Sequence, residues 1–266
     1  MVEYLILDYE RKEEARLLLN SIKKYSKFDY TVTFLCNGGE QSYAKKLKEE
    51  GLIDKLILNQ VNTGSGGGTV QLFAQCETKY ALYIQVDQIL SAELTDRHIN
   101  AFIDLIENKG YCYVDLAGDQ CNGIYSERAQ FINTKFYNSI PKSVGGAGPW
   151  HGMTWTEEHI QNYIKDNKLK YKSVYFVDES QQDANGQNVR MPVFMNNGKW
   201  SHRSNLDGSK WKHRTDTKQL WVIKKPTKKF DYPNLTDEEW ELAFNGKWPN
   251  GDVPEKDKSH SFLHWK

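Results

Sequence analysis

The chain has 266 residues, 39% of them hydrophobic, and its 35 Lys and Arg residues are balanced by 35 Asp and Glu residues. That length and composition suit one large soluble domain, or one domain with an appendage. The balanced charge excludes a global electrostatic attraction to nucleic acid or to an anionic membrane, and no stretch has the roughly 20 apolar residues of a membrane span.

The first half of the sequence alternates between runs typical of strands and runs typical of helices. Short apolar runs, rich in β-branched and aromatic residues, predict strands at 2–9, 30–36, 54–59, 80–86 and 111–117. Apolar residues at helical spacing predict helices at 10–25, 40–51, 70–78 and 96–110. This alternation predicts an α/β fold with a mostly parallel, Rossmann-like sheet flanked by helices.

The pattern changes after Gly123. Residues 124–140 are typical of an antiparallel strand and a short helix, 141–153 of a flexible loop, and 154–168 of a further helix. From Asp178 onward the periodicity is weak, which predicts loops and short strands closed by one short helix near 236–244. We therefore expect one domain over 1–177 and an irregular extension over 178–266 that packs on the same domain.

Two features near the middle of the chain need a common explanation. The segment "NTGSGGGT" at 62–69 places glycines before a helix, and Asp87 follows an apolar strand. In parallel sheets, ligands bind at the carboxyl ends of the strands, which places Asn37, the glycine segment and Asp87 along one edge. The alternatives are a flexible linker for the glycines and an ordinary turn residue for Asp87.

The order of these motifs resembles the GT-A fold glycosyltransferases, closest in pattern to the family 2 group. "TVTFLCNGG", "NTGSGGG" and "YALYIQVDQIL" follow one another as that family's motifs do, and the resemblance covers roughly residues 2–165. Cys36 stands where the family has an acid before its Asn-Gly turn, and Gln85-Val86-Asp87 stands where it has Asp-x-Asp. The resemblance implies a donor site that includes Asn37, Asn62, Gly64, Gly66, Gly67, Gln85, Asp87 and Arg214.

The segment "GGAGPWHGMTWTEEHIQ" carries the candidate catalytic acids. Thr154 and Glu157 have the spacing of a capping box, which predicts that Glu157 and Glu158 lie in a first helical turn. The resembled family has a Glu-Asp pair in this place, and its second acid is the general base for the acceptor hydroxyl. The resemblance thus implies that Glu158 is the base, with Glu157 as second choice, and the candidate acceptor platform is Trp150, His151 and Trp155. Helix capping and ordinary packing are the alternative explanations.

Two similar segments, "KWSHRS" and "KWKHRT", lie in the C-terminal region. Their histidines and arginines are suited to binding a diphosphate, and the resemblance implies that a C-terminal histidine completes a metal shell. His213 and Arg214 are preferred over His202 and His264, and Asp87 with His213 would hold Mn²⁺ or Mg²⁺. The alternative is a pair of strands or a basic surface patch.

The leading hypothesis is a glycosyltransferase that uses a nucleotide-sugar donor and inverts at the anomeric carbon. A catalytically inactive carbohydrate-binding protein and a nucleotidyltransferase are the alternatives, while Rossmann dinucleotide and P-loop motifs are missing from the sequence. The four cysteines lack the paired spacing of a zinc site and the N-terminus lacks a secretory pattern, which predicts free thiols and a cytoplasmic protein. The nucleotide, the sugar, the acceptor and the oligomeric state are not fixed by the sequence.

Overall fold

The computed structural model describes residues 1–117, 128–141, 153–182 and 188–196. It also describes two short antiparallel strand pairs near the C-terminus, in which β14 (Trp221–Val222) pairs with β17 (His264–Trp265) and β15 (Lys247–Trp248) with β16 (Gly251–Asp252). The short helix predicted near 236–244 and the loop predicted at 141–153 lie largely outside the described residues.

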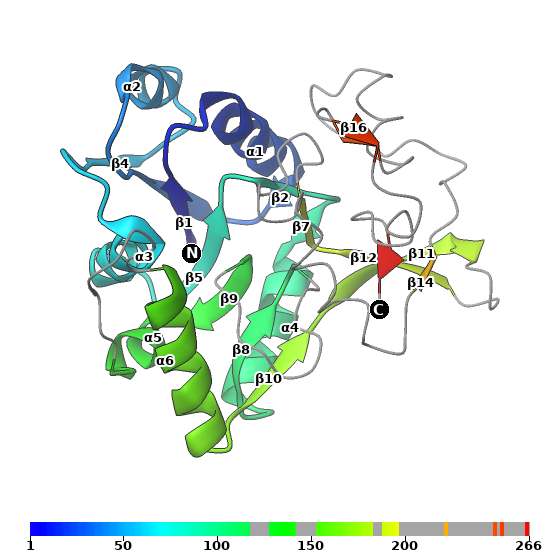
Figure 1. Cartoon of the computed structure of the whole chain (residues 1–266). Coiled ribbons are helices and arrows are strands. Elements are labelled where there is room, and N and C mark those ends of the chain that lie inside the picture. The colour runs from blue at the N-terminus through cyan, green and yellow to red at the C-terminus, as the bar shows by residue number, and fades with distance from the viewer. Residues whose placement is uncertain are drawn as a thin grey trace.

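A seven-stranded sheet forms the centre of the described region, in the order β10-β8-β9-β5-β1-β3-β4 (Figure 1). Six strands run in the same direction, and β9 runs against its neighbours β5 and β8. This confirms the mostly parallel sheet and the antiparallel strand after Gly123. The strands are β1 (Val2–Asp8), β3 (Tyr30–Cys36), β4 (Lys55–Leu58), β5 (Tyr80–Gln85), β8 (Tyr111–Asp115), β9 (Gln130–Asn133) and β10 (Lys170–Ser173).

Helices cover both faces of the sheet (Figure 1). One face packs against α1 (Lys12–Tyr25), α2 (Ser42–Glu49) and α4 (Asp96–Glu107), whose buried residues join a common apolar cluster. The opposite face packs against α3 (Gly64–Ala74), α5 (Thr134–Ser139) and α6 (Met153–Asp166). Two apolar layers on either side of one sheet are the arrangement that alternating strands and helices predict.

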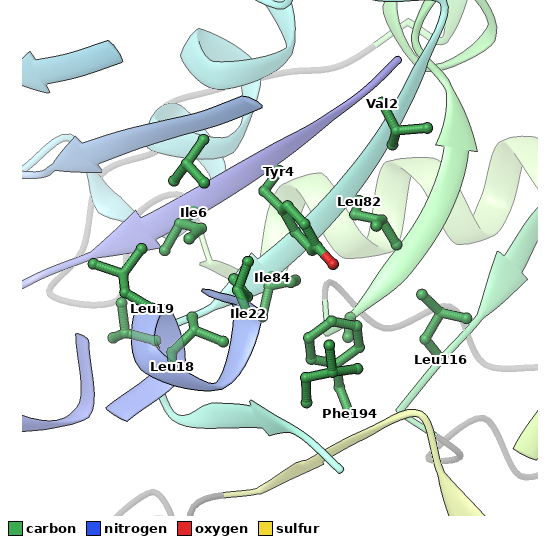
Figure 2. Packing of buried hydrophobic residues seen from close by; sticks show 14 of the residues in the cluster. Val2, Tyr4, Ile6, Leu18, Leu19, Ile22, Leu82, Ile84, Leu116 and Phe194 are labelled. Atoms are coloured by element: carbon green, nitrogen blue, oxygen red, sulfur yellow. The ribbon is translucent and has the colours of Figure 1, made fainter. Parts of the chain in front are cut away.

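The larger cluster shows how the pattern of α1 produces this packing. Leu18, Leu19 and Ile22 recur at helical spacing and are fully buried, so that one side of α1 faces the sheet. Figure 2 shows these side chains close to Tyr4 and Ile6 of β1, which alternate with side chains of the other face. Apolar residues that recur every 3.6 positions along the helix and every second position along the strand therefore pack in one core.

Strands beyond 177 also contact this domain. β13 (Phe194–Asn196) pairs in antiparallel fashion with β6 (Gln88–Leu90), and Phe194 is fully buried near Leu116 (Figure 2). The peptide N–H of Phe194 donates to the carbonyl of Leu116 at 3.0 Å. The boundary between 177 and 178 and the packing of the whole extension stay predictions. The remaining described strands form the hairpin of β11 (Tyr175–Gln182) and β12 (Asn188–Pro192) and the pair of β2 (Ser26–Lys27) and β7 (Leu94–Thr95).

Two general expectations can be compared with the described residues. No helix in the described part of the chain is long and apolar enough to cross a membrane. Of the four cysteines, Cys36, Cys76 and Cys112 are free thiols, as predicted, and Cys36 and Cys112 are buried, while Cys121 lies outside the described residues.

Candidate functional site

The carboxyl edge of the sheet contains a point where the strand order reverses. From β1 the chain adds β3 and β4 on one side, and then crosses to place β5 on the other side of β1. The helices that follow β1 and β4 pack on opposite faces, and it is at such a point that open α/β sheets bind their ligands. Asp8 ends β1 and Gln85 ends β5, so that both residues lie at this switch point.

Asp87 lies at the switch point in an ion pair with Arg11. It occupies the turn between β5 and β6, and its carboxylate Oδ2 is 3.2 Å from Nη1 of Arg11, which precedes α1. The Asp87 side chain is 10% exposed and that of Arg11 is 30% exposed. The arginine is therefore the more accessible partner, and the buried acid has the counter-charge that burial requires.

Asn37 holds the glycine segment in place through its buried side chain. Its amide Nδ2 donates to Oδ1 of Asn62 at 3.0 Å and to the carbonyl of Gly64 at 2.9 Å. Its Oδ1 accepts hydrogen bonds from Nδ2 of Asn59 at 2.9 Å and from the hydroxyl of Thr63 at 2.8 Å. The Thr63 peptide N–H donates to the same oxygen at 3.2 Å. One side chain thus joins the ends of β3 and β4 to the start of α3.

The glycines that were expected to precede a helix at 70–78 are themselves part of the helix, which corrects the predicted helix bounds. α3 begins at Gly64 and ends at Ala74, because tertiary packing overrides the low helix propensity of glycine here. A Cβ on Gly68 would lie 2.5 Å from Cδ1 of Leu7 and 3.2 Å from Nδ2 of Asn37. The absence of a side chain lets α3 pack directly on β1 and on the Asn37 network. Gly64, with a φ of +76°, supplies the left-handed backbone at the helix start.

Asp8 is a buried acid that the sequence reasoning missed. It is 1% exposed, it accepts a hydrogen bond from the Tyr43 hydroxyl, and its Oδ1 accepts one from the Arg11 peptide N–H at 3.3 Å. Burial raises the pKa of Asp8 to about 6, although both hydrogen bonds and the Arg11 charge lower it. The pKa of Tyr43 is raised by burial and by the Asp8 carboxylate, so that Tyr43 stays a protonated donor. Asp8 pairs in register with Cys36, the position where the resembled family has its acid.

We expect Asp8→Asn to change how stability depends on pH. Because the folded pKa lies near 6 and the ordinary value is 3.8, the folded state holds the proton more tightly than the unfolded state. The stabilising contribution is full below pH 3.8 and is lost as the pH rises through 6. The variant lacks this loss, so that its free energy of unfolding relative to the natural protein should rise by about 1–3 kcal/mol between pH 4 and pH 7.5. Urea unfolding at the two pH values measures this difference, and equal differences at both would contradict the raised pKa.

Further buried polar side chains lie along the carboxyl edge of the sheet. Asp115, at the end of β8, accepts a hydrogen bond from the Ser173 hydroxyl at 2.8 Å and one from the Ala117 peptide N–H at 3.1 Å. It pairs in register with Gln130, which is fully buried at the start of β9. The edge is therefore polar from β3 across β1 and β5 to β8.

The structure brings part of the predicted donor site together. Asn37, Asn62 and Gly64 share one network, Gly66 and Gly67 lie in the first turns of α3, and Gln85 pairs in register with Leu7 beside Asp8. Asp87 lies across the β1 end from this network. Arg214, His213 and His202, together with Trp150 and His151, lie outside the described residues.

The candidate catalytic acids lie on a helix whose start differs from the prediction. α6 begins at Met153, one residue before Thr154, so that its first turn has no acid and the capping box is wrong. The backbone of Glu157, Glu158 and Trp155 is helical, and their side chains lie outside the described residues. α6 runs into β10, which is parallel to β8, so the N-terminal end of α6 is directed toward the carboxyl edge of the sheet. α6 also packs against α3.

A divalent metal does not fit the described residues by themselves. Among the residues whose side chains the structure describes, 1–117, 128–141, 160–176 and 193–194, no group of three His, Cys, Asp or Glu side chains is placed to hold a metal ion. Asp87 offers one carboxylate, and that carboxylate is paired with Arg11. Because His213 lies outside the described residues, a metal bound by Asp87 and His213 stays a prediction.

Of the two site residues that the sequence analysis did not name, Asp8 could have been found from the sequence and Arg11 could not. Asp8 ends an apolar run in the same way as Asp87, and the same argument about a buried acid applies to both. Arg11 lies in the charged run "ERKEEA", where a solvated helix surface is the ordinary explanation, and only the fold shows that it reaches Asp87.

No family model matches the chain, and no curated protein matches it in sequence. Among solved structures it is similar to mannosyltransferase PcManGT from Pyrobaculum calidifontis in complex with GDP-Man and Mn²⁺, with 10% identity and a TM-score of 0.50. That match covers 65% of this chain and 54% of the other. It is also similar to S. aureus TarS 1–349 in complex with UDP, with 14% identity and a TM-score of 0.47 over 65% of this chain and 57% of that one. Against a longer TarS chain the matched part is 35% of its length.

The match to the mannosyltransferase agrees with the sheet order and the two helical layers. The chain has a GT-A-like glycosyltransferase fold. This confirms the fold that the sequence motifs resembled. The chain spans about half the length of that mannosyltransferase. A match of 10% identity shows a shared fold and does not show a shared activity, which depends on the residues of the site.

Proposed function

We propose that this protein is a glycosyltransferase that takes a sugar from a nucleotide-diphosphate donor and transfers it to an acceptor hydroxyl. The observation that carries the proposal is the pairing of Asp87 with Arg11 at the switch point of the sheet, beside the network of Asn37. Ligands of open α/β sheets bind at such a point. The mannosyltransferase of similar fold carries GDP-Man, a donor of this class.

In this proposal the donor lies over the carboxyl ends of β1, β3 and β5. The nucleoside lies near Asp8 and the glycine end of α3, where Gln85 is placed to bind a ribose hydroxyl with an amide that both donates and accepts. The diphosphate lies at Asp87 and Arg11. A rigid arrangement is needed because a donor site works by fixed polar groups, and the five hydrogen bonds of Asn37 supply that rigidity.

Glu158 is proposed as the general base, with Glu157 as second choice. The direction of α6 supports this, because its N-terminal end points toward the edge that bears Asp87. A carboxylate on the acceptor side takes the proton of the attacking hydroxyl while the bond between the anomeric carbon and the nucleoside diphosphate breaks. Because the hydroxyl attacks from the face opposite the leaving group, the configuration of that carbon is inverted. Trp150, His151 and Trp155 are proposed to bind the acceptor, and Arg214 the diphosphate.

Thermal unfolding in the presence of UDP, GDP, CDP and dTDP tests the donor class, with Mn²⁺ and with EDTA. A ligand at a hundred times its dissociation constant adds about 2.7 kcal/mol to stability, which raises the melting temperature of a domain of this size by about 5–10 °C. We expect this rise with one nucleoside diphosphate. No shift with any of the four nucleotides, in either condition, would contradict the proposed function.

A further inference from the structure

The position beside Asp87 needs a cation before a diphosphate can bind there. A carboxylate and a diphosphate repel each other, so a positive group must lie between them. In the described structure that group is the guanidinium of Arg11, 3.2 Å from the Asp87 carboxylate. The described residues do not form a metal site at this point.

Arg11 has the chemistry and the placement to bind phosphate oxygens. A guanidinium carries five N–H donors, and the contact to Asp87 is made by Nη1. Its side chain is three times as exposed as that of Asp87, 30% against 10%, so that it forms the accessible side of the pair. Its backbone is anchored, because the Arg11 peptide N–H donates to Oδ1 of the buried Asp8. The side chain therefore projects from a fixed point at the end of β1.

We propose that Arg11 is a donor-binding residue whose guanidinium contacts the diphosphate of the nucleotide sugar, while Asp87 orients it. This inference rests on the proposed function and deepens it. It assigns the positive charge of the site to a side chain of this chain, so that nucleoside diphosphates bind without a divalent ion. It also explains why one acid is enough in Gln85-Val86-Asp87, since a guanidinium needs one carboxylate to orient it, whereas a metal ion needs several ligands.

Two other carboxyl groups lie in the field of Arg11. The Arg11 charge lowers the pKa values of Asp8 and Glu14, while burial raises both. Both groups are buried, so each gives up its negative charge more readily than an exposed carboxyl does when a second anion arrives.

The test is calorimetric binding of UDP and GDP in EDTA to the natural protein, to Arg11→Met and to Arg11→Lys. Arg16→Met is the matched control, because Arg16 lies on α1, which Arg11 directly precedes, pairs with Glu50 at 2.6 Å on the surface, and is outside the site. We expect one of the two nucleotides to bind, and to bind the natural protein and Arg16→Met with equal affinity. Arg11→Met should weaken binding tenfold or more, with a smaller loss for Arg11→Lys. Melting temperatures measured beside the titrations show that each variant is folded.

Binding of the corresponding nucleosides separates a direct contact from a structural role. If Arg11 contacts the diphosphate, Arg11→Met should weaken the binding of UDP or GDP but leave the binding of uridine or guanosine unchanged. Equal losses for nucleoside and diphosphate would overturn the proposal. Binding that requires Mn²⁺ would also overturn it, while leaving the proposed function intact. If neither condition gives binding of any nucleoside diphosphate, the proposed function itself fails.

Discussion

Glu158→Gln is expected to abolish glycosyl transfer while donor binding stays unchanged. The amide of glutamine has nearly the shape of the carboxylate but cannot accept the acceptor's proton, and loss of a general base lowers a rate by about 10²–10⁴-fold. The helix that carries Glu158 points its N-terminal end at the carboxyl edge, on the side of α3. Release of nucleoside diphosphate from the donor, with the acceptor present, measures kcat, and calorimetry measures the donor's Kd.

The control is Asp166→Asn, which changes an exposed acid at the other end of the same helix. It should leave kcat unchanged. Glu157→Gln is measured beside it, because Glu157 is the second candidate. A large loss of activity in Glu157→Gln with no loss in Glu158→Gln would identify Glu157 as the base. If neither variant loses activity, a carboxylate base on α6 is excluded. A protein that only binds carbohydrate would be indifferent to both changes.

Asn37→Ala is expected to have the largest effect on stability among changes at the edge. The substitution removes five hydrogen bonds at once, although Asn59 keeps its hydrogen bond to Gln71 and Asn62 keeps the one from the Gly64 peptide N–H. Each hydrogen bond contributes about 0.5–1.5 kcal/mol net, and solvent entering the gap compensates for part of the loss. We expect a loss of about 3–5 kcal/mol in the free energy of unfolding, measured in urea, together with loss of nucleotide binding.

Asn37→Asp separates the two halves of this network. An aspartate keeps the oxygen that accepts from Asn59 and Thr63, but it cannot donate to the Gly64 carbonyl. Its loss of stability should be smaller than that of Asn37→Ala. Asn108→Ala, which removes an exposed hydrogen bond to Asp104 at 2.7 Å, is the reference for a surface asparagine. A loss in Asn37→Ala no larger than in this reference would contradict the role given to Asn37.

The sequence predicted the order of strands and helices well because each element carries its own period. Leu18, Leu19 and Ile22 recur at helical spacing, and the strands are short apolar runs bounded by turns, so that local pattern and global fold agree. The placement of Asn37 and Asp87 on one edge followed from a general property of parallel sheets rather than from any contact.

The glycine segment shows where local reasoning fails. Propensity places a loop at Gly64 to Gly68, but α3 begins there because β1 and Asn37 leave no room for a side chain at Gly68. That constraint comes from residues more than 25 positions away and has no local pattern. The start of α6 was misplaced because capping-box spacing at Thr154 also occurs inside helices.

The pairing of Arg11 with Asp87 was out of reach for a similar reason. A single arginine among several charged residues has no periodicity that marks it as functional. Its partner becomes visible only when β1 and β5 are known to be neighbours. The roles of Glu157, Glu158, His213 and Arg214 stay predictions.

The most direct measurement of the central claim is donor consumption by the natural protein. Sugars linked to UDP, GDP, CDP and dTDP are incubated with the protein and a panel of glycan, peptide and lipid acceptors, and nucleoside diphosphate release is followed together with the mass of the acceptor. Our account predicts that one nucleotide class is consumed and that an acceptor gains one sugar for each nucleoside diphosphate released. Donors of all four classes that remain intact with every acceptor, under conditions in which a nucleoside diphosphate binds, would contradict it and would favour a carbohydrate-binding protein.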